Sequence, residues 1–199
     1  TLGWGTSTWG GEQIDAIKPP VETLDILPMD SFRTEFMGRQ WGVPAEFLVY
    51  DGRPYYARDV LAYTLLHGVV IRPGSPESME RVSALWGVHD EFPFSHGEMS
   101  GYWMNGDLVR IAGSPSGSLE SGPPAVYASV WQLPRQGSLI VVSNLTDRDA
   151  DARLTLNLEE LGTGTGRVWD VLSGETLTVE RGRLRLPVES WRYRVLRVQ

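Results

Sequence analysis

The spacing of apolar residues changes near residue 98, and the two parts of the chain predict different kinds of structure. In the first part, a mostly apolar run at 43–50 and a β-branched run at 69–71 flank a segment with helical spacing. The apolar residues of that segment are Ala57, Val60, Leu61 and Leu65. A run without alternation is typical of a strand buried on both faces, so residues 43–72 predict a strand–helix–strand unit with parallel strands.

Glycine, serine and proline mark the limits of the predicted helices. Gly68 is placed to end the first helix, and His67 lies in its last turn, where a donor or a cation suits the carboxyl end. Ser75 and Pro76 predict the start of a second helix, because serine caps helices and proline fits the first helical position. Gly87 is expected to end that helix.

Three further segments precede this unit. Residues 1–22 are rich in glycine and tryptophan and are expected to form an irregular loop. Residues 23–29 predict a short strand that ends at Asp30, and residues 31–40 predict a helix with phenylalanines on one side. The first part of the chain is therefore interpreted as α/β.

After residue 98 the pattern becomes that of antiparallel strands. Leu154, Leu156 and Leu158 alternate with polar residues, and short apolar runs recur between turn signals. Arginines also occupy alternate positions and are expected on a solvated face; they are Arg183, Arg185, Arg192 and Arg194. The spacing predicts an antiparallel β-sandwich, so the fold class is α/β followed by all-β.

Composition excludes several classes of partner. The 199 residues carry 18 basic and 25 acidic side chains, and a net charge of −7 disfavours a nucleic-acid partner. No apolar run approaches the roughly 20 residues of a membrane span, so no membrane partner is expected. Cysteine is absent, which excludes disulfides. We expect no cofactor, since neither a phosphate loop nor a dinucleotide fingerprint occurs.

Polar residues follow the predicted parallel strands. Asp30, Tyr50, Asp51 and Arg72 are expected at the carboxyl ends of strands, the edge where α/β sheets and barrels bind ligands. Paired carboxylates there, with Glu35 nearby, could serve as acid and base on a glycosidic bond. The alternative is that Asp51 begins an Asp-Gly turn and Glu35 is a surface charge. Arg72 stays charged, so it should pair with Asp51 or Asp30 or face a polar cleft.

Aromatic residues in predicted loops are candidates for sugar binding. Trp41, Tyr55 and Trp103 lie in or beside loops, and an aromatic ring can stack on the flat face of a sugar. The alternative is that the tryptophans are packing residues at the junction of the two domains. We expect packing for Trp86, Trp131, Trp169 and Trp191.

Two other patterns have weaker functional interpretations. His89 and His96 lie in an acidic segment and could join a carboxylate in a metal site, but their spacing matches no helical metal motif. An exposed polar loop is the favoured interpretation, and no metal is predicted. Asn144 begins an Asn-Leu-Thr sequence that fits the glycosylation pattern, which is short and common.

Several motifs resemble the C-terminal part of glycoside hydrolase family 123-like proteins. The Tyr102-Trp103 pair would open the sandwich, Val142–Leu145 would be its "SNL" strand, and Asp170–Glu175 its acidic hairpin. The stretches "FMGRQWGVPAEFLVY" and "LLHGVVIRP" resemble the last two strands of the barrel of such enzymes. The resemblance covers most of residues 25–199.

This resemblance implies a fold, an activity and the location of the catalytic residues outside this chain. Residues 1–97 would be the C-terminal part of a (β/α) barrel, and residues 98–199 a β-sandwich that braces it through Tyr102 and Trp103. The activity would be that of a retaining hydrolase acting on glycans, with a substrate-assisted mechanism as one option. The acid and base of such enzymes are adjacent acidic residues on an earlier strand, so we expect them upstream of Thr1.

The sequence therefore favours one function and leaves a rival open. We expect a C-terminal fragment of a glycoside hydrolase, with a carbohydrate substrate and with the preceding part of the same polypeptide as its partner. Tyr50, Arg72, Trp41, Tyr55 and Trp103 would bind the substrate. The rival is a non-catalytic carbohydrate-binding or scaffold protein built on the sandwich, which would need exposed, coplanar aromatic residues there.

Overall fold

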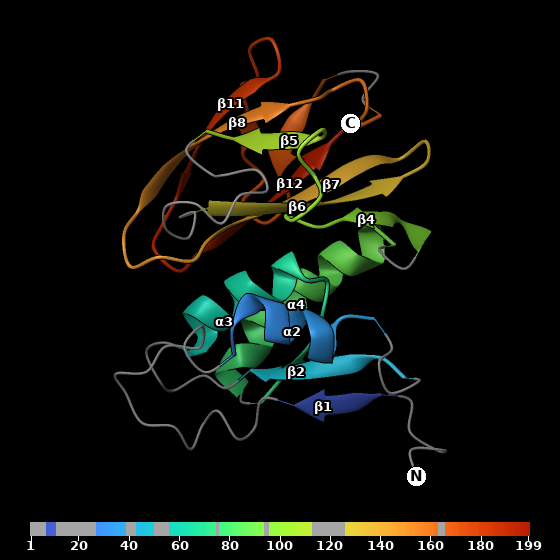
Figure 1. Ribbon diagram of the computed structural model, residues 1–199, viewed down its shortest axis with the longest axis vertical. Coiled ribbons are helices and arrows are strands. Elements are labelled where there is room, and N and C mark those ends of the chain that lie inside the picture. Colours follow the sequence, from blue (N-terminus) through green and yellow to red (C-terminus); the bar gives the residue numbers. More distant parts are fainter. Residues whose placement is uncertain are drawn as a thin grey trace. The chain divides into compact units, whose positions relative to one another are not determined.

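The chain divides into a first unit, Thr1–Ser83, and a second unit, Ala84–Gln199. The computed structural model in Figure 1 describes residues 7–10, 27–38, 43–49, 56–74, 76–93, 96–112, 126–162 and 166–199. Within these ranges, no helix combines the length and the apolar character needed to cross a bilayer.

A three-stranded parallel sheet forms the first unit. Its order is β1 (Thr8–Gly10), β2 (Ala45–Val49) and β3 (Val70–Pro73), and both pairings are parallel. The pairing of β2 with β3 confirms the adjacent parallel strands predicted over residues 43–72. The irregular loop expected over 1–22 is wrong at β1, where a short segment without alternation gains its order by hydrogen bonding to β2.

Within the described residues, the helices that accompany this sheet along the chain are α2 (Met29–Phe36), α3 (Tyr56–Leu66) and α4 (Pro76–Glu91). The predicted strand end at Asp30 is wrong, because Asp30 lies in the first turn of α2. Pro28 precedes that turn with a φ of −55°, and an acidic residue is favoured at the amino end of a helix.

Two glycines were predicted to end helices, and the structure confirms one of these predictions and contradicts the other. Gly68 follows α3 with a φ of +63°, the left-handed conformation that ends a helix at little cost. Gly87 was expected to end α4, but the helix continues to Glu91. Val88 and Phe92 are buried and extend the apolar stripe, which outweighs the roughly 1 kcal/mol that a glycine costs inside a helix.

An aromatic cluster holds α2 and α3 against one face of the sheet. The ring centroid of Phe32 lies 5.3 Å from that of Phe47 on β2 and 4.7 Å from that of Tyr63 on α3. His67 joins the cluster at 4.9 Å from Phe32, and its Nδ1 donates a hydrogen bond to the Tyr63 carbonyl at 2.7 Å. Phe36 also packs on Phe47, with centroids 5.2 Å apart. These contacts fix which face of the sheet is covered.

The second unit contains two antiparallel sheets. The larger has the order β10-β9-β12-β7-β6-β4, and the smaller has the order β11-β8-β5. The strands of the larger sheet are β4 (Glu98–Ser100), β6 (Val126–Leu133), β7 (Gly137–Asn144), β9 (Val168–Asp170), β10 (Thr176–Leu177) and β12 (Tyr193–Val198). Those of the smaller sheet are β5 (Val109–Ile111), β8 (Ala150–Leu156) and β11 (Arg183–Val188). The predicted antiparallel strands are confirmed.

A shared hydrophobic core lies between these two sheets. Ile140 and Val142 of β7 and Leu196 of β12 meet Leu154 of β8 and Leu186 of β11 in one buried cluster. In β8 and β11 every second residue is buried and the others are exposed. Figure 1 shows β5, β8 and β11 on one side of this core, with β6, β7 and β12 on the other.

A buried amide joins the end of β7 to the loops around it. The Nδ2 of Asn144 donates to the carbonyls of Arg148 and Val188, at 2.7 and 3.1 Å. Its Oδ1 accepts from the backbone N–H and the hydroxyl of Thr146, at 3.1 and 2.8 Å. Asn144 is fully buried, so the folded chain has no room for a glycan on this nitrogen.

The first prediction concerns the acid sensitivity of the first unit. Burial lowers the pKa of His67 from 6.5 to about 4, and Arg33 lowers it further. Between these two pH values the unfolded chain binds more protons, so acidification from pH 6.5 to 4 should destabilise the folded state by up to about 3 kcal/mol. Urea denaturation, followed by the helical circular dichroism signal, should therefore depend less on pH in His67→Leu. The control His96→Gln changes an exposed histidine; equal slopes for both variants and the wild type would contradict this account.

The second prediction concerns Asn144. Asn144→Ala leaves buried carbonyls without a donor, which should lower the free energy of unfolding by about 3 kcal/mol in urea denaturation. The control is Asn157→Ala, since Asn157 is exposed and its Oδ1 accepts one bond, from Glu160 N–H at 3.3 Å. That change should cost below about 1 kcal/mol. Similar losses of unfolding free energy in the two variants would show that the buried hydrogen bonds of Asn144 contribute no more stability than the exposed bond of Asn157.

Candidate functional site

The parallel sheet presents a second face, opposite the aromatic cluster. Phe47 faces the helices and is paired in register with Ile71, so both lie on the covered face. Residues one position away point the other way, because side chains alternate along a strand. Glu46, Leu48, Val70 and Arg72 therefore share the second face.

An ion pair crosses this second face. The Nη1 of Arg72 lies 3.8 Å from the Oε2 of Glu46, and the two side chains are 51% and 23% exposed. Such a long and partly solvated pair contributes about 0 to 1 kcal/mol. Val70, which is 43% exposed, provides apolar surface beside the two charges. The face thus combines a guanidinium, a carboxylate and an aliphatic side chain within reach of a ligand.

The placement of Arg72 corrects one prediction. We expected it just beyond a strand, with Asp51 or Asp30 as partner, but it lies within β3 and pairs with Glu46. Sequence reasoning did not select Glu46, although a single carboxylate inside the apolar run at 43–50 was an available signal. Side chains alternate along β2, and this alternation places Glu46 on the same face as Arg72. The partner of Arg72 is therefore decided by the face of the sheet and not by the end of a strand.

The other predicted carboxylates lie elsewhere or outside the described residues. Asp30 is 92% exposed on α2 and pairs with Arg33, Oδ1 to Nη1, at 3.2 Å. Glu35 is exposed on the same helix. Since α2 packs on the covered face of the sheet, neither residue joins the Glu46–Arg72 face. The predictions for Trp41, Tyr50, Asp51 and Tyr55 concern residues outside the described ranges.

Trp103 lies in an aromatic cluster of the second unit. Its ring meets that of Tyr102 edge to face, with centroids 4.8 Å apart, and Tyr102 packs on Tyr127 at 5.2 Å. The backbone N–H of Tyr102 donates to the hydroxyl of Ser129 on β6 at 3.1 Å. Burial raises the pKa of Tyr127 to about 12, so its hydroxyl stays protonated. Trp103 is half-buried, and part of its ring remains open to solvent.

The remaining tryptophans divide between packing and exposure. Trp131 is buried, which confirms the packing predicted for it, but Trp86 is 40% exposed and that prediction is wrong. Trp169 is half-buried, with the guanidinium of Arg167 at 5.0 Å from its ring centroid. Trp191 is half-buried as well.

The histidines of the acidic segment are not brought together with a third ligand in the described part of the chain. His89 lies on α4 and His96 in the turn before β4, and both are exposed. Among the described residues, no group of three His, Cys, Asp or Glu side chains is close enough to hold a metal ion.

The acidic hairpin at Asp170–Glu175 is held by a buried carboxylate. The Oδ1 of Asp170 accepts from the backbone N–H groups of Leu172 and Ser173, at 2.8 and 3.1 Å. Its Oδ2 accepts from Arg194 Nε, and Arg194 also pairs with Glu175. Arg194 was expected on a solvated face, but only 21% of its side chain is exposed. The buried carboxylate requires a cation, and β12 is an interior strand that brings one beside it.

Comparisons with known proteins gave structural likeness alone. No protein-family model matches this sequence, and no curated protein gives a significant match. The GH27 β-L-arabinopyranosidase of Geobacillus stearothermophilus is similar at 9% identity and a TM-score of 0.47, over 81% of this chain and 33% of its own. An Anoxybacillus α-amylase is similar at 9% identity and a TM-score of 0.46, over 77% and 38%.

A third neighbour is an α-amylase from Malbranchea cinnamomea, at 13% identity and a TM-score of 0.41, over 76% of this chain and 37% of its own. All three neighbours are glycoside hydrolases. The present chain spans between 33% and 38% of their length.

The third prediction concerns the Trp103 ring. A Cβ at Gly101 would lie 2.3 to 2.5 Å from three atoms of that ring, so Gly101→Ala must displace it. We expect a loss of about 1 to 3 kcal/mol in unfolding free energy and a changed tryptophan emission spectrum. The control is Gly87→Ala, because no atom lies within 4 Å of a Cβ there and alanine should stabilise α4 by about 1 kcal/mol. An unchanged emission spectrum in Gly101→Ala would contradict the tight packing of this ring.

Proposed function

We propose that this chain is the C-terminal part of a glycoside hydrolase. In this proposal β1, β2 and β3 belong to a (β/α) barrel, and the second unit is a β-sandwich that braces it. The observation that carries the proposal is the polar second face of the parallel sheet, with the Glu46–Arg72 pair opposite the helix-covered face. In a barrel the helices surround the strands, so this face points inward, toward the region where such enzymes bind substrates.

The chemistry of this face suits a sugar. A sugar ring carries hydroxyl groups at its edge and C–H groups on its faces. The guanidinium of Arg72 can donate to hydroxyl oxygens, while the carboxylate of Glu46 can accept from hydroxyl groups. Val70, which is 43% exposed, supplies an apolar contact. The ion pair between Arg72 and Glu46 is long and partly solvated, so its contribution is small.

Cleavage would require a second carboxylate. Hydrolysis of a glycosidic bond uses two carboxyl groups, about 5 to 9.5 Å apart, and substrate assistance replaces one of them in some families. Glu46 is the one carboxylate that the described residues place on this face. We therefore propose, as the family resemblance implies, that the acid and base belong to polypeptide upstream of Thr1. Asp51 remains the alternative within this chain.

The rival function has less support. A carbohydrate-binding module that uses an aromatic platform needs exposed, coplanar rings on its sheets. In the described part of the second unit Trp131 is buried, and Trp169 and Trp191 are half-buried. The proposal of a hydrolase therefore comes first.

The fourth prediction tests the sugar-binding face and the missing carboxylates together. The 199-residue chain should not hydrolyse aryl glycosides. It should nevertheless bind neutral oligosaccharides, taken from glycans that glycoside hydrolases cleave, and this binding should be visible as saturation-transfer NMR signals. Arg72→Gln should reduce these signals at least about threefold, because it removes the charged donor. The matched control is Arg33→Gln, which removes an arginine that pairs with exposed Asp30 on α2.

Two outcomes would overturn the proposal. Turnover that is abolished by Asp51→Asn would place the catalytic carboxylates within this chain. Transfer signals that are absent, or equal in Arg72→Gln and Arg33→Gln, would remove the sugar-binding role of the second face.

A further inference from the structure

The outer face of the small antiparallel sheet carries a cluster of arginines. In β8 and β11 the leucines point into the core, so the residues between them point outward. Arg110 and Arg183 lie on either side of Thr155 in one row across the three strands. In the next row Arg185 lies directly opposite Arg153. The four arginines thus lie on three neighbouring strands, in two rows that are two residues apart along the strands.

Carboxylates neutralise this cluster only in part. Arg185 Nε donates to both carboxylate oxygens of Asp151, at 2.7 and 2.8 Å, and Arg110 lies 3.8 Å from Asp107. Within the described ranges, no carboxylate pairs with Arg153 or Arg183, and both side chains are exposed. Asp151 also interacts electrostatically with Arg153, so one carboxylate serves two guanidinium groups and this row of the sheet keeps a net positive charge.

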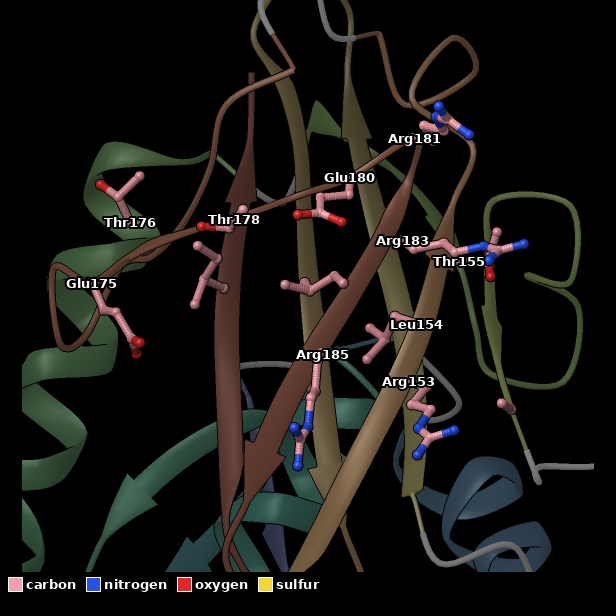
Figure 2. A pocket seen from close by; sticks show the side chains of 13 residues that line it. Arg153, Leu154, Thr155, Glu175, Thr176, Thr178, Glu180, Arg181, Arg183 and Arg185 are labelled. Carbon is pink, nitrogen blue, oxygen red and sulfur yellow. The ribbon is translucent and has the colours of Figure 1, made fainter.

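A groove of about 1330 Å³ runs along this cluster. Arg153, Arg183 and Arg185 line it together with Thr155, and the segment after β10 adds further polar side chains. Figure 2 shows Arg153 and Arg185 near one end of the view, and Arg183 with Thr155 farther along. The groove is therefore bordered by cations that lie in two successive rows of the sheet.

β10 and the residues on either side of it supply groups of a different kind. Glu175 and Glu180 line the groove, and so do the hydroxyl groups of Thr176 and Thr178. Arg181 also borders it, with a φ of +51° at the turn before β11. An arginine in this conformation is strained relative to glycine or asparagine, so backbone preference does not explain its presence.

We propose that this groove binds a glycan that carries carboxylate groups among neutral sugars. The guanidinium fork matches a carboxylate with two parallel hydrogen bonds, and Arg153 and Arg183 have charge available for it. Threonine hydroxyls and glutamate oxygens match the hydroxyl groups of the neutral sugars. The choice of a sugar as the scaffold rests on the proposed function. A nucleic acid fits less well, because a phosphate on every unit would meet Glu175 and Glu180.

The test measures binding of the 199-residue chain to hyaluronan oligosaccharides, in which a carboxylated sugar alternates with a neutral one. Isothermal titration calorimetry should show binding that weakens with salt and that drops at least about tenfold for carboxyl-reduced hyaluronan. The double variant R153Q/R183Q should bind hyaluronan at least about tenfold more weakly than the wild type.

The matched control is the double variant R135Q/R148Q. It removes the same number of charges from exposed arginines that do not line the groove. Its affinity should stay within about twofold of the wild type, since only the net charge has changed. Because all four arginines are exposed, we expect both variants to fold, and thermal melts followed by circular dichroism check this.

Three results would overturn the inference: no binding of hyaluronan, equal binding of its carboxyl-reduced form, or equal losses in the two double variants. Tighter binding of a DNA duplex than of hyaluronan would show a general polyanion surface instead. The wild-type chain separates the two proposals: if it gives no saturation-transfer contacts to neutral oligosaccharides but binds hyaluronan in a way that R153Q/R183Q weakens, the proposed function is refuted and the groove remains.

Discussion

The alternation of side chains along paired strands is the constraint on which the rest of this structure depends. In β8 and β11 it sends Leu154 and Leu186 into the core, and each such burial contributes about 1.5 to 3 kcal/mol. A slip of one residue would expose those leucines and bury arginines, so the register is strongly specified. The hydrophobic core thereby fixes Arg153 and Arg185 on the outer face, although neither residue contributes to that core.

The same constraint orders the first unit with different chemistry. Phe47 is drawn to the helix side by contacts with two phenylalanines of α2, and its neighbour Glu46 is then forced to the opposite face. The parallel pairing with β3 brings Arg72 to that face as well. The aromatic cluster thus determines where the polar pair lies, and loosening it would displace the candidate site without any change in the site residues.

Sequence patterns predicted the features that depend on local residue spacing. They missed the features that depend on contacts with residues distant in the sequence. The strands at 45–49 and 70–73 and the left-handed Gly68 follow from short runs and turn chemistry. Thr8–Gly10 became a strand through pairing with β2, which no local pattern indicates. Glu46 was missed because a single carboxylate within an apolar run shows no chemistry until the register supplies Arg72. Arg194 was misplaced for the same reason, since its buried partner Asp170 is distant in sequence.

The charges of the second unit separate structural arginines from available ones. Arg194 serves a buried carboxylate, and removing it would leave Asp170 charged in an apolar setting, which is costly. Arg153 pairs with no buried carboxylate among the described residues; it lies opposite Arg185 on the exposed face, where Asp151 interacts with both. A glutamate at residue 153 would also keep the alternation of β8, and it would lie opposite Arg185. The chain has a net charge of −7 and contains 25 acidic residues, yet residue 153 is an arginine. The outward positions of β8 and β11 do not contribute to packing in the core, so the core alone does not require arginine at residue 153.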